Sequence, residues 1–114
     1  MFHSKKDAQP FTIPGGTDGV LYPPSPKGDQ SVAVIEMDGS YPQKGYSMND
    51  QCTETIYMLE GSFRVEYDGA WYTLNPGDLL MLLPGKKYRT QGKGKACVLI
   101  TPSWNSEQNH LTES

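Results

Sequence analysis

The sequence has little of what most catalytic and metal sites are built from. It contains two histidines, His3 and His110, which lie near the two ends, and two cysteines, Cys52 and Cys97, among 114 residues. Because the middle of the chain has no histidine, a histidine-rich metal centre is excluded there. Two cysteines are too few for a disulfide framework, so we expect both to be free thiols.

Long hydrophobic runs and a surplus of positive charge are also missing. The longest aliphatic run, residues 79–83, is far too short to cross a membrane. Thirteen acidic residues against ten basic ones give a net charge of -3, which attracts neither nucleic acid nor anionic lipid. Residues 1–7 do not resemble a secretory signal, and the sequence therefore predicts a cytoplasmic protein without nucleic-acid or membrane partners.

What the sequence does contain favours one all-β domain. Twelve glycines, nine prolines and seven tyrosines accompany few strong helix formers, and the length suits a single core. Turn residues divide the chain into an extended, turn-rich N-terminal arm (1–30), a barrel core (31–101) and a polar C-terminal tail (102–114). We expect the arm to run along the sheet.

Short strands at regular spacing predict a sandwich or a barrel within the core. Asp68-Gly69 is the two-residue signal of a tight hairpin, and the pairing it implies puts apolar residues opposite one another. We expect residues 79–83 to be a buried strand, and residues 92–94 to be a loop. The predicted strands are 31–38, 54–59, 62–67, 70–74, 79–83, 87–91 and 96–101.

Two spaced patterns resemble the motifs of the cupin superfamily over about residues 31–101. In the first, Gly45, Glu54 and Gly61 hold the places of the conserved glycines and glutamate; in the second, Gly77 and Gly85 hold the glycine places. The resemblance implies a small jelly-roll β-barrel with an internal pocket, often dimeric.

The metal-binding histidines of that pattern are not present. With a four-residue gap before Glu54 their first two places are Ser47 and Asn49, with a three-residue gap Met48 and Asp50, and the last place is Tyr88. The sequence thus resembles the scaffold of the superfamily without its usual metal ligands. We expect no cofactor.

Glu54 and Tyr88 are the main site candidates. Glu54 begins a strand whose inward residues include Ile56 and Met58, and apolar surroundings raise a carboxyl pKa into the range useful for a general acid or base. Tyr88 would offer a hydroxyl and a ring face from the facing strand. A purely structural hydrogen-bonded carboxylate and a core-filling tyrosine are the alternatives.

Other predicted ligand-binding residues would complete the pocket. Ser47 and Asn49 would supply neutral hydrogen bonds, and Met58 and Met81 an adaptable apolar lining, although a plain loop and ordinary core packing explain them equally well. Lys86 begins a positive run near the expected mouth, which either captures an anionic group or is a solvated rim. That run consists of Lys86, Lys87, Arg89, Lys93 and Lys95.

A weak metal site is a further alternative. Asp50, Cys52 and Glu54 alternate, so a continuous strand would put all three on one face, whereas a turn would separate them.

The sequence therefore predicts a metal-free, homodimeric cupin-like barrel that binds a small polar molecule, sugar-like or bearing a carboxylate or phosphate. The alternative is a metal-independent isomerase, epimerase or lyase acting on a sugar or carbonyl compound, in which Glu54 moves the proton and Tyr88 stabilises the oxyanion. A third possibility is a structural partner of another protein, which an exposed apolar patch on the outer face would favour.

Overall fold

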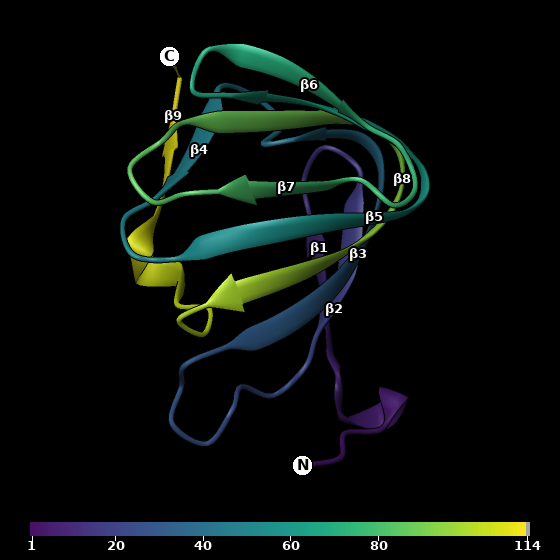
Figure 1. Cartoon of the computed structure of the whole chain (residues 1–114), viewed down its shortest axis with the longest axis vertical. Coiled ribbons are helices and arrows are strands. Elements are labelled where there is room, and N and C mark those ends of the chain that lie inside the picture. The colour runs from purple at the N-terminus through teal and green to yellow at the C-terminus, as the bar shows by residue number, and fades with distance from the viewer. Residues whose placement is uncertain (114) are drawn as a thin grey trace.

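The computed structural model describes residues 1–113, and the regular secondary structure of these residues is almost entirely β-strand (Figure 1). No helix in this range is long and apolar enough to span a membrane. Two 3-10 turns, η1 (Lys5–Asp7) and η2 (Ser106–Gln108), flank the strands. The strands are β1 (Gln9–Ile13), β2 (Thr17–Leu21), β3 (Ser31–Tyr41), β4 (Tyr46–Asn49), β5 (Thr53–Tyr67), β6 (Ala70–Leu74), β7 (Leu79–Leu82), β8 (Tyr88–Thr101) and β9 (Asn109–Thr112).

Two long strands, β5 and β8, hold the fold together. β8 pairs with β5 along one edge and with β3 and β4 along the other, while β5 also pairs with β6 and β7. Strands β1, β2 and β3 form an antiparallel extension, and every pairing is antiparallel. The sheet curls on itself into a jelly-roll β-barrel, which confirms the predicted fold class (Figure 1).

Glycines make the curl possible. Gly61 of β5 pairs with Gly94 of β8, and a Cβ atom on Gly61 would lie 2.3 Å from the Lys93 carbonyl oxygen. The φ of Gly61 is +73°, which other residues rarely adopt. The prediction of a loop at residues 92–94 is therefore wrong, because Gly92 and Gly94 lie within the continuous strand β8. Gly61, which the sequence places between two strands, likewise lies within the continuous strand β5.

The Asp68-Gly69 hairpin is confirmed in its register. Phe63 pairs with Leu74 and Val65 with Tyr72, as the two-residue turn predicts. Phe63, Val65 and Leu74 are buried.

The prediction of a buried strand over residues 79–83 is wrong. β7 lies at the edge of the curled sheet and turns only Leu82 fully inward, while Leu79 and Met81 are 52% and 53% exposed on its outer side. An all-apolar run predicts a strand covered on both faces, but only one face of β7 is covered within the chain.

The two ends of the chain take part in the sheet. The segment 1–30 contains the β1–β2 hairpin, which pairs with β3, and the C-terminal segment contains β9, which pairs with β4. Trp104 packs against the core, and its backbone N–H donates to Ser31 Oγ over 3.0 Å.

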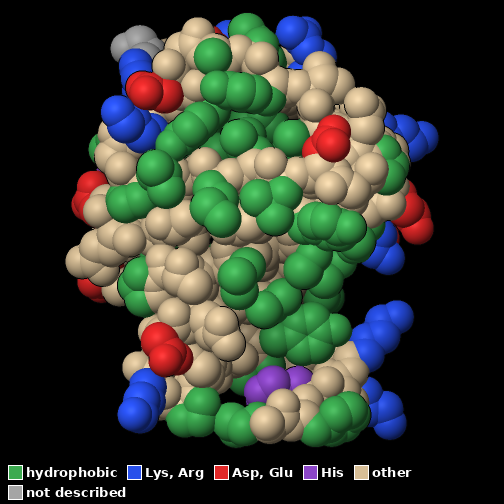
Figure 2. Space-filling view, in the orientation of Figure 1, with side chains coloured by type: hydrophobic (Ala, Val, Ile, Leu, Met, Phe, Trp, Pro, Cys, Tyr) green, Lys and Arg blue, Asp and Glu red, His purple; other side chains and the backbone are tan. Residues whose placement is uncertain are grey.

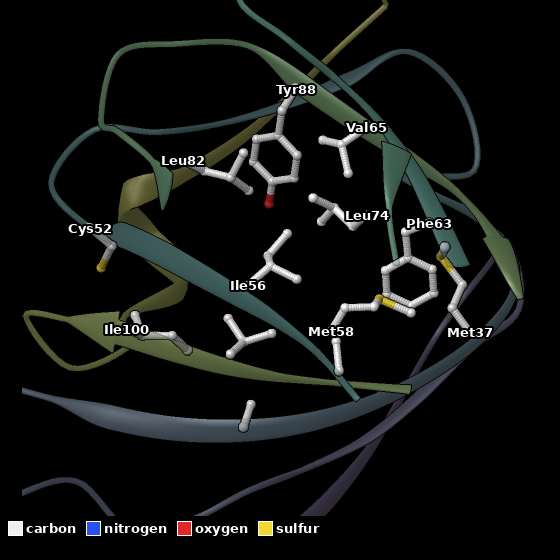
Figure 3. Packing of buried hydrophobic residues seen from close by; sticks show 13 residues of the cluster. Met37, Cys52, Ile56, Met58, Phe63, Val65, Leu74, Leu82, Tyr88 and Ile100 are labelled. Atoms are coloured by element: carbon white, nitrogen blue, oxygen red, sulfur yellow. The ribbon is translucent and has the colours of Figure 1, made fainter. Parts of the chain in front are cut away.

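The buried core lies inside the curl, between the walls that β5 and β8 contribute (Figure 3). Its largest fully buried side chains include Phe63, Met58 and Leu82. The cavity that holds the candidate site lies in this interior, and its wall includes Tyr88 and Ile100 as well as Phe63 and Met37 (Figure 3).

Candidate functional site

A cavity of about 390 Å³ opens inside the barrel. Its volume falls in the range of small-molecule sites, about 300–1,000 Å³. Most of its wall is apolar and comes from β1, β3, β5 and β8, including Phe11, Ile35, Ile56 and Val98. The polar residues of the wall are Gln9, Thr17, Tyr41, Glu54, Tyr88 and Thr90.

Glu54 and Tyr88 meet in this cavity. The Tyr88 hydroxyl donates to Glu54 Oε2 over 3.0 Å, and both residues line the wall. Glu54 is held by pairing of β5 with Leu82 and Ile100, and Tyr88 by pairing of β8 with Ser47 and with the far end of β5. Figure 3 shows the Tyr88 ring directing its hydroxyl into the interior.

Burial tunes the proton affinities of this pair. Loss of hydration raises the pKa of Glu54 above its ordinary value, and the hydrogen bond from Tyr88 opposes that rise. Burial is the largest cause that holds the pKa of Tyr88 well above the ordinary tyrosine value, and the negative charge of the neighbouring Glu54 carboxylate is the second. Tyr88 therefore stays protonated as a donor, while Glu54 can exchange a proton closer to neutral pH than an exposed glutamate does.

Tyr41 is a third hydroxyl in the same part of the wall. Its ring centroid lies 6.2 Å from that of Tyr88, and its hydroxyl lies 3.3 Å from Ser47 Oγ. Burial raises the pKa of Tyr41, so it too remains a neutral donor. Tyr41 is not among the site residues that the sequence predicts, although it lies next to Pro42 at the end of a strand whose alternate residues face inward.

A layer of neutral amides and hydroxyls lies behind the tyrosines. Asn109 Nδ2 donates to Ser47 Oγ and to Asn49 Oδ1, each over 2.9 Å, and Gln108 Nε2 donates to Asn49 Oδ1 over 2.9 Å. Gln108 Oε1 in turn accepts from the backbone N–H of Cys52 over 3.0 Å. The predicted polar tail therefore supplies part of the buried support of the site.

In the four-residue register, the histidine and glutamate places of the cupin motifs lie close together in the structure. They are Ser47, Asn49, Glu54 and Tyr88. Ser47 and Asn49 are buried beside the cavity, and Glu54 and Tyr88 line it. In the three-residue register Asp50 would be the second place, but Asp50 is exposed and contacts His110 Nε2 over 2.6 Å. Ser47 and Asn49 do not themselves line the cavity, because Tyr41 and the Tyr88–Glu54 pair stand in front of them.

Three other predicted site residues lie elsewhere. Met58 is fully buried in the core and is not part of the cavity wall. Met81 pairs with Thr55 on the outer side of the sheet, so the prediction that it lines the pocket is wrong. Lys86 Nζ lies 3.4 Å from Asp68 Oδ2 beside the hairpin turn, away from the cavity wall.

The positive run faces outward as a solvated rim. Arg89 Nε pairs with Glu66 Oε1 over 2.7 Å and its guanidinium lies over the rings of Tyr46 and Trp71. Lys95 lies 3.8 Å from Glu36. Among the described residues no lysine or arginine lines the cavity, so nothing in its wall favours an anionic ligand.

The side chains present do not fit a transition metal. Among residues 1–113 no group of three or more His, Cys, Asp and Glu is arranged to hold an ion. β4 ends at Asn49 and β5 begins at Thr53, so Asp50 and Cys52 lie in a connection and do not share a face with Glu54. Cys52 instead directs its thiol toward the Pro102 carbonyl, 3.4 Å away, and the remaining motif places offer neutral oxygens.

The N-terminal hairpin also contributes to the cavity wall, which the sequence does not predict. Gln9, Phe11 and Ile13 alternate along β1 and face the cavity, as do Thr17 and Leu21 of β2. That period of two was visible in the sequence, but the density of prolines and glycines around it indicated an arm rather than a wall.

Comparison with known proteins agrees with this architecture. The model of a family described as a cupin domain matches residues 34–102, more than half of the chain. The chain belongs to the cupin family. No curated protein matches the sequence of this cupin.

Solved structures with the same fold cover nearly the whole cupin. Pac13 from Streptomyces, described as a nucleoside dehydratase, superposes with a TM-score of 0.87 at 13% identity, covering 99% of this chain and 91% of that chain. KdgF from Halomonas sp. gives 0.74 at 16% identity, covering 94% and 97%. An RmlC-like cupin from Shewanella frigidimarina gives 0.76 at 19% identity, covering 93% and 94%. These likenesses concern the fold.

Proposed function

We propose that this cupin binds a small, uncharged, partly apolar molecule in its barrel without a metal ion, with Glu54 and Tyr88 as the polar contacts. The observation that carries the proposal is the 3.0 Å hydrogen bond between these side chains in a largely apolar cavity. Apolar walls bury the body of a ligand, and a few fixed polar groups orient it. A ligand with hydroxyl or carbonyl groups suits a carboxyl and a phenol, whereas an anion would meet Glu54 with no compensating cation.

A neutral nucleoside is the first probe to try. Variants of the structurally similar Streptomyces protein Pac13 are described in complex with uridine. Uridine combines a planar base with a polyol and carries no charge, which suits an apolar wall with separate polar groups. Other neutral glycosides and simple sugars complete a rational screening set.

Metal-independent proton transfer is the second candidate function, and the raised pKa of Glu54 beside a protonated Tyr88 favours it. In a lyase reaction, Glu54 removes a proton from the carbon next to a carbonyl, and the electron pair of that C–H bond forms an enolate whose oxygen accepts from Tyr88. The enolate then collapses to a C=C bond as the C–O bond at the next carbon breaks. The departing hydroxide takes the proton now held by Glu54 and leaves as water.

Ligand-induced thermal shifts test the binding proposal directly. The wild type should be stabilised by at least one neutral compound, and Glu54→Gln and Tyr88→Phe should each weaken that effect. Losing a hydrogen bond to a neutral ligand group costs about 0.5–1.5 kcal/mol, or about 2- to 13-fold in affinity.

Glu60→Gln and Tyr57→Phe are matched controls, because Glu60 and Tyr57 belong to the same strand but are exposed on its outer side. Ligands that bind all variants equally would contradict the site. If Glu54→Gln binds a compound normally but abolishes its conversion, as followed by mass spectrometry, the enzyme proposal replaces simple binding.

A cytoplasmic homodimer is the remaining part of the proposal. The outer face of β7, β5 and β8 exposes Leu79, Met81, Tyr57 and Leu99, and Figure 2 shows hydrophobic side chains gathered across this face. None of these four side chains is charged, so two copies can meet face to face without bringing like charges together. A second copy of the chain is therefore the occupant we propose for this face.

A further inference from the structure

The ring of Phe11 lies face-on over a glycine of the neighbouring strand. Phe11 of β1 pairs directly with Gly19 of β2. A Cβ atom placed on Gly19 would lie 2.6 and 2.7 Å from the two ε carbons of the ring and slightly closer to its ζ carbon. No position in the plane of the ring and outside it is nearly equidistant from these three carbons. The face of the ring, and not its edge, therefore covers Gly19.

The side of the hairpin on which the ring lies is the wall of the cavity. Alternate residues of β1 and β2 line the cavity, namely Gln9, Phe11, Ile13, Thr17 and Leu21. The residues between them face outward: Thr12 and Asp18 are exposed, and Thr12 Oγ1 donates to Asp18 Oδ1 over 3.0 Å. Because strand residues alternate between faces, Gly19 holds a cavity-side position. Phe11 covers that position, so the second face of its ring is turned toward the cavity.

The backbone does not explain why residue 19 is a glycine. Gly19 lies in the middle of β2, and its φ is not among the positive values that favour glycine. Glycine inside a strand lowers stability relative to residues with a side chain. What Gly19 provides is space, because any Cβ atom there would collide with the Phe11 ring. The hairpin lacks a side chain at the one place where its absence lets an aromatic ring lie flat on the wall.

The ring lies a ligand's length from the polar contacts of the site. Gly19 pairs with Ile35, and Ile35 pairs with Ala96 of β8. Glu54 pairs with Ile100 of the same strand. The two rows are four residues apart on β8, roughly 13 Å at about 3.3 Å per residue. Residues of both rows line the same cavity, so one small molecule can contact both.

We propose that the cavity-side face of Phe11 is a stacking surface for a flat ring of the ligand, and that Gly19 provides the space in which the Phe11 ring lies. The inference rests on the proposed function, because it concerns the same cavity. Stacked rings attract one another beyond the area they bury, and a puckered ring makes fewer such contacts. The ligand class thus narrows to neutral compounds that join a flat, unsaturated ring to a part that hydrogen-bonds with Glu54 and Tyr88.

Pairs of neutral compounds that differ in ring flatness test this in the whole chain. Uridine and dihydrouridine share their sugar, carbonyl and N–H groups, but saturation puckers the base of the second. Phenyl β-glucoside and cyclohexyl β-glucoside form a second pair. Calorimetric titration measures each affinity for wild type, Phe11→Leu and Gly19→Ala. Phe2→Leu is the matched control, because Phe2 is 87% exposed and lies outside the cavity wall.

We expect wild type to bind the flat member of at least one pair about 2- to 13-fold more tightly than its puckered partner. Phe11→Leu should remove this preference, because leucine keeps an apolar side chain but has no ring face, whereas Phe2→Leu should keep it. Gly19→Ala should weaken binding of the flat compound as well, although it removes no ring atom, because its methyl group pushes the ring off the wall.

Each other outcome overturns a stated part of the argument. A preference that survives in Phe11→Leu means that the ring only stabilises the hairpin, and it overturns the stacking surface while loss of affinity on Glu54→Gln keeps the proposed function. Unchanged binding by Gly19→Ala overturns the role of the glycine. Binding that ignores Glu54→Gln overturns the proposed function, and a panel without any binder overturns both. Should Phe11→Leu fail to fold, equal affinities of wild type within both pairs would overturn the inference.

Discussion

Tyr88 donates to Glu54 across the interior although the two residues are far apart in the strand pairing. On the ladder Tyr88 pairs with Tyr67, at the end of β5, while Glu54 lies near its beginning. Their 3.0 Å hydrogen bond therefore joins the two ends of β5 through β8 and closes the curl of the sheet. The same contact that closes the barrel is also the polar centre of its cavity.

The first prediction concerns the pH dependence of stability. Because burial raises the pKa of Glu54, the native state holds its proton over a pH range in which the unfolded state, with an ordinary pKa of about 4.3, has lost it. The difference in unfolding free energy between wild type and Glu54→Gln should therefore be most favourable to wild type below about pH 4.3, and wild type should lose about 1.4 kcal/mol per pH unit relative to the variant as the pH rises toward the native-state pKa.

Urea denaturation of both proteins between pH 4 and pH 8 measures this difference. Above the native-state pKa the difference should become constant, because both states are then ionised. A difference that grows in favour of wild type with rising pH would mean that the carboxylate is stabilised in the native state, contrary to the proposed environment of Glu54.

The second prediction concerns Tyr88→Phe. Removing the hydroxyl takes away a hydrogen bond that lowers the pKa of Glu54, so that pKa should rise further. A hydrogen bond to a charged acceptor contributes about 1.5–3 kcal/mol, so the loss of stability should be larger above the Glu54 pKa than below it.

Carbon-13 NMR titration of the glutamate carboxyls measures the shift, with Tyr57→Phe as the exposed control. An unchanged Glu54 pKa in Tyr88→Phe would show that the contact does not control the carboxyl.

The sequence alone predicts the fold and the site correctly where a local pattern or a motif spacing determines them. Asp68-Gly69 determines a hairpin register by turn geometry, and the spacing around Glu54 and Tyr88 locates two residues that meet 34 positions apart in the chain. Both inferences use short-range rules or a family motif whose spacing reflects one fold.

The errors arise where the deciding contact is long-range. Gly92 and Gly94 are turn formers by composition, yet pairing with β3 and β5 holds them within one bent strand. Met81 alternates with Leu82 in an all-apolar run, and only the closure of the barrel determines which of them faces inward. Thr17 lines the cavity because the N-terminal hairpin packs onto the barrel, and Asn109 supports Ser47 because the C-terminal tail does. Neither contact follows from the local sequence of its segment.

The third prediction concerns the C-terminal support of the site. Gln108 is buried, donates to Asn49 and accepts from the backbone N–H groups of Gln51 and Cys52. Gln108→Leu should leave the backbone N–H groups of Gln51 and Cys52 without their acceptor and cost about 1–3 kcal/mol in unfolding free energy, measured by urea denaturation. Gln91→Leu at an exposed position of β8 is the control and should change stability by less than about 0.5 kcal/mol. Equal stabilities of the two variants would contradict a structural role for the tail.

The fourth prediction concerns self-association through the outer face. Wild type should be a dimer in solution, and Leu79→Lys combined with Met81→Lys should give a monomer, because dimerisation would then bury unpaired ammonium groups. Light scattering behind a sizing column measures both masses. Leu111→Lys, at an exposed position on β9, should remain dimeric. A monomeric wild type at micromolar concentration would contradict the dimer, and a dimer that persists in the double variant would mean that another face is used.

The last prediction is that the purified protein carries no stoichiometric transition metal. The cupin-motif places bring one carboxyl, one amide and two hydroxyls together, and Tyr88 keeps its proton because its pKa is raised well above the ordinary value. Zinc, iron and nickel favour imidazole or thiolate ligands, and the thiol of Cys52 points to a backbone carbonyl instead of the cavity. Elemental analysis after mild dialysis should therefore find far less than one metal ion per chain. Close to one ion per chain in wild type that disappears in Glu54→Gln, but not in Glu60→Gln, would overturn the metal-free proposal and make Glu54 a ligand.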